Sequence, residues 1–252
     1  MARHIPISDL RPCDVLLYHG DSAVSQVIQW FDGSDYGHAS IFDGSMVVEA
    51  LSGGVTRNEV GVSVAGSIFV DVWRMNRDGH SIGSPELPDG PVLDVVGRYA
   101  GEDGRYACEE MLLLALLCTG RRLPQPFLRW AFDRAASWLD GLADEGREPM
   151  LSSELVFRCF SEAEGGYGPR IIGVDIRAKV ETLHMPGRAR RRMSPSDRLV
   201  AEFLDRYAST RHKETRDELL MAAIEADPNF ITPGDLSRSP DFTKIGRLQP
   251  LS

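Results

Sequence analysis

The first half of the chain begins with short apolar segments that are separated by turn-forming residues, which is typical of strands. Asp14–Tyr18 predicts a buried strand, and Ile68–Met75 predicts another by its alternation of apolar and polar positions. Between them, Asp43-Gly44 separates two alternating segments, which is a strong signal for a hairpin. This region therefore predicts a small antiparallel sheet.

Helical spacing of apolar residues dominates the rest of the chain. Helices are predicted at 23–31, 92–99, 106–118, 127–142, 152–163, 195–207 and 214–226, with a last helical turn near 232–235. Residues 76–90 are rich in glycine, proline and polar residues, so they predict a connector.

The order of these elements indicates the fold class. Strands come first and helices later, which favours an α+β fold over an alternating α/β fold. We predict a single domain over residues 1–252. It would carry a helical insertion at 77–150 and a helical C-terminal extension at 194–252.

The predicted hairpin brings a histidine and a glutamate together. With a two-residue turn at Asp43-Gly44, His38 and Glu49 lie directly opposite each other, on the face without the continuous apolar stripe. A carboxylate beside an imidazole fixes the tautomer and stabilises the imidazolium, which suits a general base. The alternative is a surface ion pair without chemistry. A register shift of one residue would put the two side chains on opposite faces.

Ser152 lies at the predicted start of a helix that follows Pro149. A nucleophile at such a position gains from the positive end of the helix dipole, and the free backbone N–H groups can hold a developing oxyanion. Serine is also a preferred N-cap residue, so a purely structural role for Ser152 or Ser153 is the alternative.

Together these segments resemble the permuted papain-like branch of the NlpC-type superfamily, particularly the YiiX-like cysteine hydrolases. The matching segments are Cys13-Asp14-Val15-Leu16-Leu17, Tyr36-Gly37-His38-Ala39, Val48-Glu49-Ala50, Ser152-Ser153-Glu154-Leu155-Val156 and the tail 231–240. The resemblance spans nearly the whole chain and implies a permuted papain-like fold. It implies His38 as general base, Glu49 as its orienting partner and position 152 as nucleophile. Tyr36 and Ser153 are then expected to contact the substrate.

Serine at position 152 departs from the family, which has cysteine there. A hydroxyl is far less acidic than a thiol, so a Cys–His ion pair cannot form in advance. Three explanations stay open: an introduced Cys-to-Ser substitution that inactivates the enzyme, a natural pseudoenzyme that binds a ligand in the same cleft, or a serine hydrolase that uses the same base. Cys13 also replaces the usual glycine, and Gly37 replaces a small hydroxyl residue.

The chemistry that the resemblance implies is acyl transfer through an acyl-enzyme. The chain would be a thiol hydrolase, amidase or acyltransferase that acts on a peptide amide, an isopeptide or an acyl-lipid bond. The rival interpretation is a non-catalytic ligand-binding module. The resemblance implies no metal and no organic cofactor, and the sequence determines neither the substrate nor the oligomeric state.

Composition narrows the set of partners. The net charge of −9, from 37 acidic and 28 basic residues, argues against broad binding to nucleic acid or anionic membranes, because both need a cationic surface. The four cysteines form no CxxC or Cys/His cluster at metal spacing. No apolar run reaches the ~20 residues of a membrane span, and Met1–Asp14 lacks the apolar run of a signal peptide. We therefore expect a cytoplasmic protein, unless a specialised secretion route delivers it.

Overall fold

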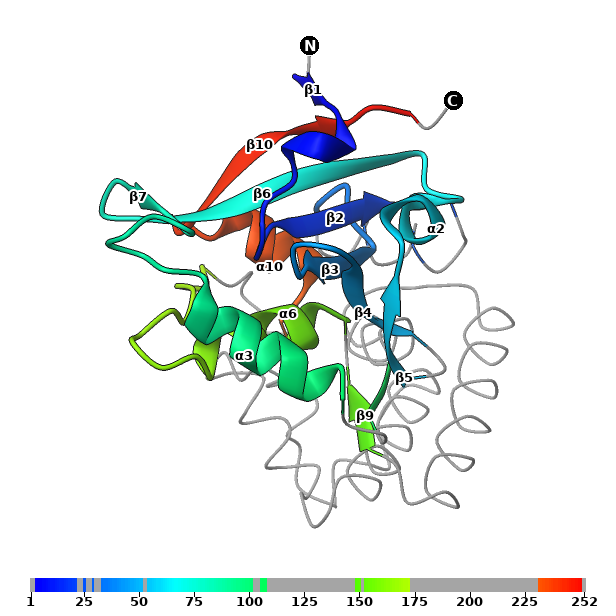
Figure 1. The fold of residues 1–252 in the computed structure, drawn as a ribbon. Helices are drawn as coiled ribbons and strands as arrows, with labels where there is room; N and C mark the ends of the chain where they lie inside the picture. The colour runs from blue at the N-terminus through cyan, green and yellow to red at the C-terminus, as the bar shows by residue number, and fades with distance from the viewer. Residues whose placement is uncertain are drawn as a thin grey trace, which may run out of the picture.

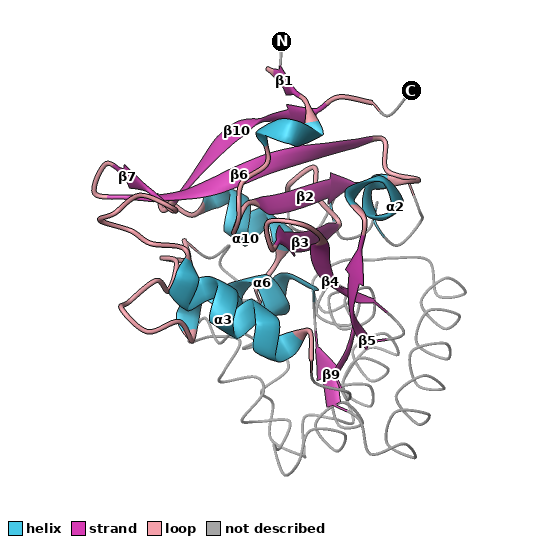
Figure 2. Ribbon diagram, viewed as in Figure 1, coloured by secondary structure: helices cyan, strands magenta, loops and turns pink. Residues whose placement is uncertain are grey.

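The computed structural model describes residues 3–21, 25, 29, 33–51, 54–101, 105–107, 148–150, 152–172 and 231–250. This part of the chain is α+β, with an eight-stranded sheet and several helices (Figures 1 and 2). The strands of the sheet are β1 (His4–Ile5), β2 (Val15–His19), β3 (His38–Phe42), β4 (Val47–Leu51), β5 (Gly54–Asn58), β6 (Phe69–Arg77), β7 (His80–Ser81) and β10 (Phe242–Leu248). Their order is β1-β10-β6-β2-β3-β4-β5, and β7 pairs with β6.

Helices and two short strands complete the described elements. The helices are the 3-10 helix η1 (Ile7–Asp9), α2 (Val60–Val64), α3 (Gly90–Tyr99), α6 (Ser152–Ser161) and α10 (Pro233–Arg238). The strands β8 (Arg105–Ala107) and β9 (Glu148–Met150) pair with each other, apart from the large sheet. Among the described helices, none combines the length and hydropathy that crossing a membrane requires.

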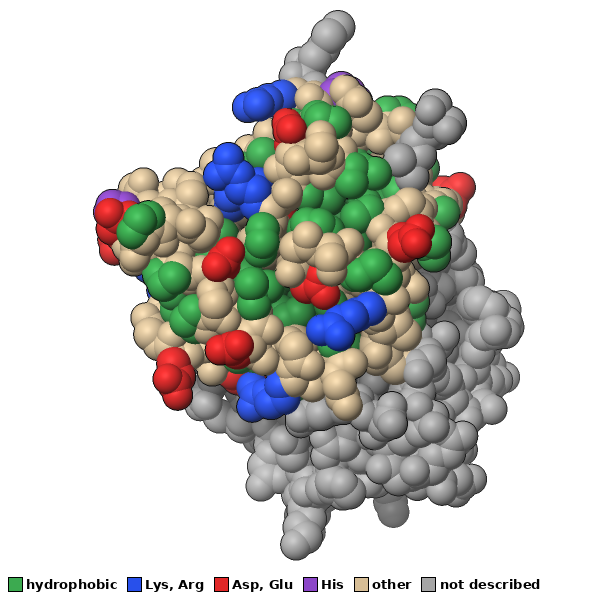
Figure 3. All heavy atoms as spheres, viewed as in Figure 1, with side chains coloured by type: hydrophobic (Ala, Val, Ile, Leu, Met, Phe, Trp, Pro, Cys, Tyr) green, Lys and Arg blue, Asp and Glu red, His purple; other side chains and the backbone are tan. Residues whose placement is uncertain are grey.

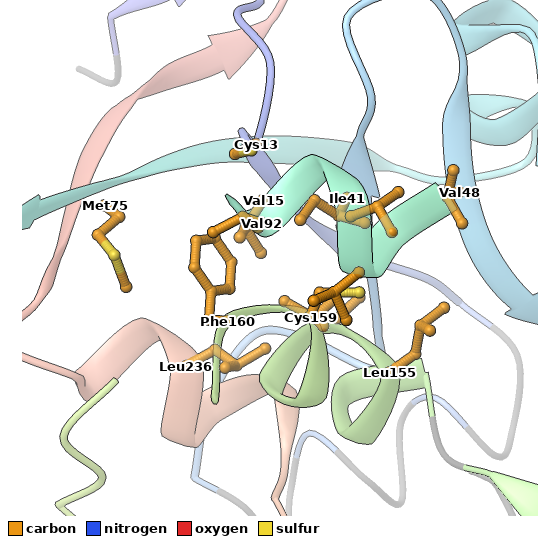
Figure 4. Packing of buried hydrophobic residues seen from close by; sticks show 14 of the residues in the cluster. Cys13, Val15, Ile41, Val48, Met75, Val92, Leu155, Cys159, Phe160 and Leu236 are labelled. Atoms are coloured by element: carbon orange, nitrogen blue, oxygen red, sulfur yellow. The ribbon is translucent and has the colours of Figure 1, made fainter. Parts of the chain in front are cut away.

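One face of the sheet packs against α3, α6 and α10 (Figure 1). Figure 4 shows the side chains that converge there from strands and helices; they include Val15, Ile41, Val48, Val92, Leu155, Phe160 and Leu236. Leu155, Cys159 and Phe160 lie on one side of α6 because their spacing follows the helical period. The helix that carries position 152 is therefore fixed against β3 and β4 by its apolar face.

The opposite face of the sheet is also buried. Leu16, Phe42, Val47 and Val72 form a second cluster, which η1 and α2 help to cover. Because both faces of β2 are covered, the strand is a nearly continuous apolar run instead of an alternating one.

The hairpin of β3 and β4 differs from the prediction in its turn. Ile41 pairs with Val48 and Phe42 with Val47, so the loop has four residues and the predicted two-residue turn is wrong. The side chain of Asp43 accepts hydrogen bonds from the backbone N–H groups of Ser45 and Met46, which stabilises the longer turn. The register moves by two residues, and a shift of two keeps every side chain on its predicted face.

The C-terminal region contains a strand that the sequence did not suggest. The predicted helical extension is wrong for Phe242–Leu248, which forms β10 between β1 and β6. It pairs in parallel with β1, so the sheet is larger than expected and not entirely antiparallel. The predicted last helical turn is confirmed as α10, where Thr232 and Asp235 form a capping box. The helices expected at 195–207 and 214–226 lie outside the described residues.

The expected helical insertion at 77–150 is mixed in structure. The helix predicted at 92–99 is confirmed as α3. The supposed connector contains the end of β6 and all of β7, and the helix expected from Tyr106 is wrong at its start because this residue belongs to β8. The remainder of that helix and the one expected at 127–142 lie outside the described residues, as does most of the helix at 23–31.

Charged side chains are dispersed over the face of the molecule that Figure 3 shows. On its described part, lysine and arginine side chains lie at separate places with acidic side chains between them (Figure 3). The single domain, the cytoplasmic location and the absence of a nucleic-acid partner stay predictions.

Candidate functional site

His38 and Glu49 form a pair across β3 and β4. Nε2 of His38 lies 2.9 Å from Oε2 of Glu49. Glu49 is only 3% exposed, whereas the side chain of His38 is 23% exposed. The pair is therefore not an exposed surface ion pair, because its carboxylate is buried and only its imidazole reaches solvent.

Several groups keep the Glu49 carboxyl ionised. Burial favours the neutral acid, but the bond and charge of His38, with hydrogen bonds from Asn58 and Ser63, hold the pKa of Glu49 below its usual value. Asn58 Nδ2 donates to Oε1 of Glu49 at 2.9 Å. The carboxylate can accept the Nε2–H of a neutral imidazole, which leaves Nδ1 as the basic nitrogen.

Tyr18 supports the imidazole from the neighbouring strand β2, where it pairs with His38. The two rings meet edge to face, with centroids 5.0 Å apart. The Tyr18 hydroxyl bonds to Ser40 Oγ and Ser63 Oγ at 2.7 Å each. Burial, followed by the nearby charge of Glu49, raises the pKa of Tyr18, so the phenol stays neutral. Sequence reasoning missed this residue, although the β2–β3 register could have indicated it.

Ser152 is the first residue of α6 and is fully buried. Its Oγ accepts a hydrogen bond from the backbone N–H of Ala39 at 3.0 Å. Ala39 directly follows His38, so Ser152 Oγ lies within about 5.5 Å of the His38 Cα atom. The structure thus brings the first turn of α6 next to the histidine. Strands β3 and β4 pair at Ile41 and Phe42 of β3 only. Ala39 lies outside this pairing, and its backbone N–H donates to Ser152 Oγ.

Tyr36 and Ser153 were expected to contact a substrate, but the structure gives their hydroxyls partners within the protein. Tyr36 is 6% exposed and its hydroxyl donates to Asp71 Oδ2 at 2.9 Å. Ser153 is fully buried and its hydroxyl donates to the carbonyl of Ile231 at 2.6 Å. Neither residue is in the wall of the cavity beside His38. They hold the sheet and the C-terminal segment in place.

A cavity of about 290 Å³ opens beside His38 and Glu49. Its lining residues are mostly small or polar: Tyr18, Gly20, Asp21, Ser25, Gly37, His38, Glu49, Leu51, Ser63, Ala65, Gly66 and Ser67. Ser152 is not among them, and no lysine or arginine is in this set.

One wall of the cavity depends on two glycines. A Cβ atom added at Gly20 or Gly37 would lie 2.8 or 2.9 Å from Ser25 Oγ, too close for ordinary contact. The hydroxyl of Ser25 therefore occupies the space that a side chain at position 37 would need. This explains in physical terms why glycine stands just before His38.

Cys13 and Cys159 are free and fully buried. Burial, above all, raises the pKa of both thiols, so neither is available as an activated nucleophile. Cys13 has a φ of 66°, a left-handed conformation that favours glycine. Within the described ranges, no three histidine, cysteine, aspartate or glutamate side chains are grouped so that they could hold a metal ion.

Comparisons with known proteins give a distant likeness in the solved structures alone. No protein-family model matches the chain, and no curated protein matches it. Among solved structures, the chain is similar to the crystal structure of the metalloprotein YiiX from Escherichia coli O157:H7. That match has 17% sequence identity and a TM-score of 0.47, and it covers 95% of this chain and 98% of the other.

Proposed function

We propose that this chain is built for acyl transfer of the permuted papain-like type. His38 would act as general base, Glu49 as its orienting partner and position 152 as the nucleophile. The observation that carries the proposal is the bond from Ala39 N to Ser152 Oγ, because it puts the start of α6 beside the backbone next to His38, whose imidazole a buried carboxylate already holds.

The proposed reaction follows from this arrangement. Glu49 accepts the Nε2–H of His38, and Nδ1 takes the proton of residue 152 as its oxygen, or a cysteine sulfur, attacks the substrate carbonyl. Backbone N–H groups in the first turn of a helix point out of its N-terminal end, and those of α6 would donate to the developing oxyanion. The bond from the carbonyl carbon to the leaving amine breaks, and His38 returns the proton to that amine. Water or another amine then releases the acyl group.

The polarity of the cavity favours an amide or isopeptide substrate over an acyl lipid. The hydroxyls of Tyr18, Ser25, Ser63 and Ser67 line it, and among the lining residues that the structure describes Leu51 is the one large aliphatic side chain. An alkyl chain in such a cavity would leave hydroxyls without water or partners, at a cost of about 1–3 kcal/mol for each unsatisfied group. A compact polar acyl group can bond to them instead.

The experiment has to take into account that residue 152 is a serine and that it is buried. Serine supports at most a slow nucleophile here, and the three explanations for it stay open. Because Ser152 is fully buried, a reagent reaches it only when neighbouring groups move. The natural gene sequence at this position would separate an introduced substitution from the other two explanations.

The experiment restores a thiol by Ser152→Cys and follows its alkylation by iodoacetamide near neutral pH, with mass spectrometry of each peptide. We expect the new thiol to react at least about tenfold faster than Cys13 and Cys159, which serve as internal controls because burial raises the pKa of both thiols. His38→Ala in the same background should remove the advantage. A thiol that reacts no faster than Cys13 would contradict the proposal.

A non-catalytic ligand-binding module is the second candidate. The observation that favours it is the full burial of Ser152 together with its bond from the Ala39 amide, because a serine that only joins α6 to β3 would make the same bond. This reading predicts that the restored thiol is inert, and that His38→Ala weakens binding of a ligand in the cavity without any acyl adduct.

A further inference from the structure

Asn58 contacts the carboxylate of Glu49 at the oxygen that His38 does not use. Its Nδ2 lies 2.9 Å from Oε1 of Glu49, whereas His38 Nε2 lies 2.9 Å from Oε2. The same amide also donates to Thr56 Oγ1 at 3.3 Å. Each oxygen of this buried carboxylate therefore has its own donor.

The position of Asn58 follows from the sheet. Glu49 in β4 pairs with Thr56 in β5, and Asn58 lies two residues further along β5, which puts it on the same face as a diagonal neighbour. β5 is the last strand in the order of the sheet, so its side chains reach the pair from the edge.

We propose that Asn58 is a positioning residue for the His38–Glu49 pair. By holding Oε1, it fixes the rotation of the carboxylate so that Oε2 faces the imidazole, and it thereby favours the tautomer that carries its proton on Nε2. The inference rests on the proposed function for its catalytic meaning, but the contact itself is a property of the resting protein.

A second set of contacts supports a rigid pair. Ser63 lies in α2 and is bonded to the Tyr18 hydroxyl, and the Tyr18 ring packs on His38. The imidazole is therefore held by a carboxylate on one side and a ring edge on another. Rotation of Glu49 away from His38 would leave a buried carboxylate oxygen unpaired, which costs more than leaving a neutral group unpaired.

The test replaces the donor by an apolar side chain with the same number of heavy atoms. In Asn58→Leu, Oε1 of Glu49 loses the hydrogen bond from Asn58, so we expect the Glu49 titration, followed by carbon NMR of its carboxyl, to move about one pH unit upward. In the Ser152→Cys background, alkylation should slow several-fold and its pH profile should change. Thr56→Ala is the matched control, because it removes the other acceptor of the same amide and leaves the bond to Glu49 intact; its titration and rate should stay near the parent values.

Asn58→Asp is a second variant that tests the inference if Asn58→Leu does not fold. It keeps the shape of Asn58 but sets a second carboxylate against Glu49, so one of the two should hold its proton to a higher pH than Glu49 does in the parent. A parent-like titration in Asn58→Asp would show that residue 58 does not contact the Glu49 carboxylate, and that result, or an unchanged Glu49 titration in Asn58→Leu, overturns the inference.

The outcomes separate this inference from the proposed function. If the thiol at position 152 is inert while the Glu49 titration moves in Asn58→Leu, the acyl-transfer proposal fails, and Asn58 positions the pair without serving catalysis. If the thiol is activated and no Asn58 variant changes it or the titration, only the positioning role is lost.

Discussion

Two carboxylates are buried in the same sheet, and their partners differ. Asp71 of β6 is 1% exposed and is bonded by Lys244 Nζ at 2.6 Å and by Arg247 Nε at 2.8 Å. Glu49 of β4 is 3% exposed and is bonded by His38 and Asn58. Both pKa values lie below the ordinary range although burial opposes it.

The difference lies in whether the partner can give up its charge. Lysine and arginine stay protonated at neutral pH, so the contacts of Asp71 join β6 to β10 permanently. An imidazole can gain and lose a proton in that range, so the contacts of Glu49 can take part in a reaction. We infer that Asp71 has a structural role and Glu49 a chemical one, and the following predictions test this contrast.

The largest effect on stability is expected from Asp71→Asn. It leaves Lys244 and Arg247 without their shared anion, so we expect a loss of about 3 kcal/mol in the free energy of unfolding, measured with denaturant. Glu59→Gln, which neutralises an exposed carboxylate, is the control and should change stability by less than about 0.5 kcal/mol. A loss of stability no larger than that of Glu59→Gln would contradict the structural role of Asp71.

Glu49→Gln should lower the free energy of unfolding less than Asp71→Asn does. It should lower the reactivity of a thiol at position 152 more. While His38 carries its proton on Nε2, the NH₂ of the new amide meets a donor in either orientation, Asn58 Nδ2 or His38 Nε2, so one hydrogen bond is lost, at about 1–2 kcal/mol. In the Ser152→Cys background, we expect alkylation to fall toward the rate of His38→Ala. A stability loss equal to that of Asp71→Asn, with unchanged alkylation, would reverse the two assigned roles.

The smallest expected effect is the loss of stability at acidic pH. Both carboxyl pKa values are lowered in the folded state, so each group adds stability above its unfolded pKa, about 4.5 for glutamate and 3.8 for aspartate, and loses it as pH falls through the folded value. Unfolding at pH 6, 4.5 and 3 should show declining stability. The decline should be shallower in Glu49→Gln from pH 4.5 downward, and in Asp71→Asn only below about 3.8. Identical slopes in all three proteins would contradict the lowered values.

The sequence predicted the relation of His38 to Glu49 better than it predicted the turn. Alternation fixes which side chains share a face, and a register change of two residues preserves it. The turn itself depends on how the Asp43 carboxylate bonds to the backbone, and several such turns are compatible with Asp-Gly. The start of α6 was predictable because Pro149 and the apolar spacing after Ser152 are local signals.

Contacts between segments that lie far apart along the chain could not be predicted from the sequence. Because of Lys244 and Arg247, the sequence of β10 resembles that of an exposed polar segment. Their positions in a strand make sense once both are seen to donate to the buried Asp71 of β6. The hydrogen bond from the Tyr36 hydroxyl to Asp71 could not be foreseen either. Asn58 carries no local signal either, since its importance comes from its diagonal position relative to Glu49 in the sheet.

The place of β10 has a consequence for how the protein is made. Strand β6 has β2 on one side, but its other side is completed by Phe242–Leu248, which a ribosome adds more than 160 residues later. Until then β6 exposes unpaired backbone groups along that edge, and Asp71 lacks both of its cations. Closure of the sheet therefore has to wait until Phe242–Leu248 has been synthesised, and the nascent protein has to avoid pairing that open edge with another chain in the meantime.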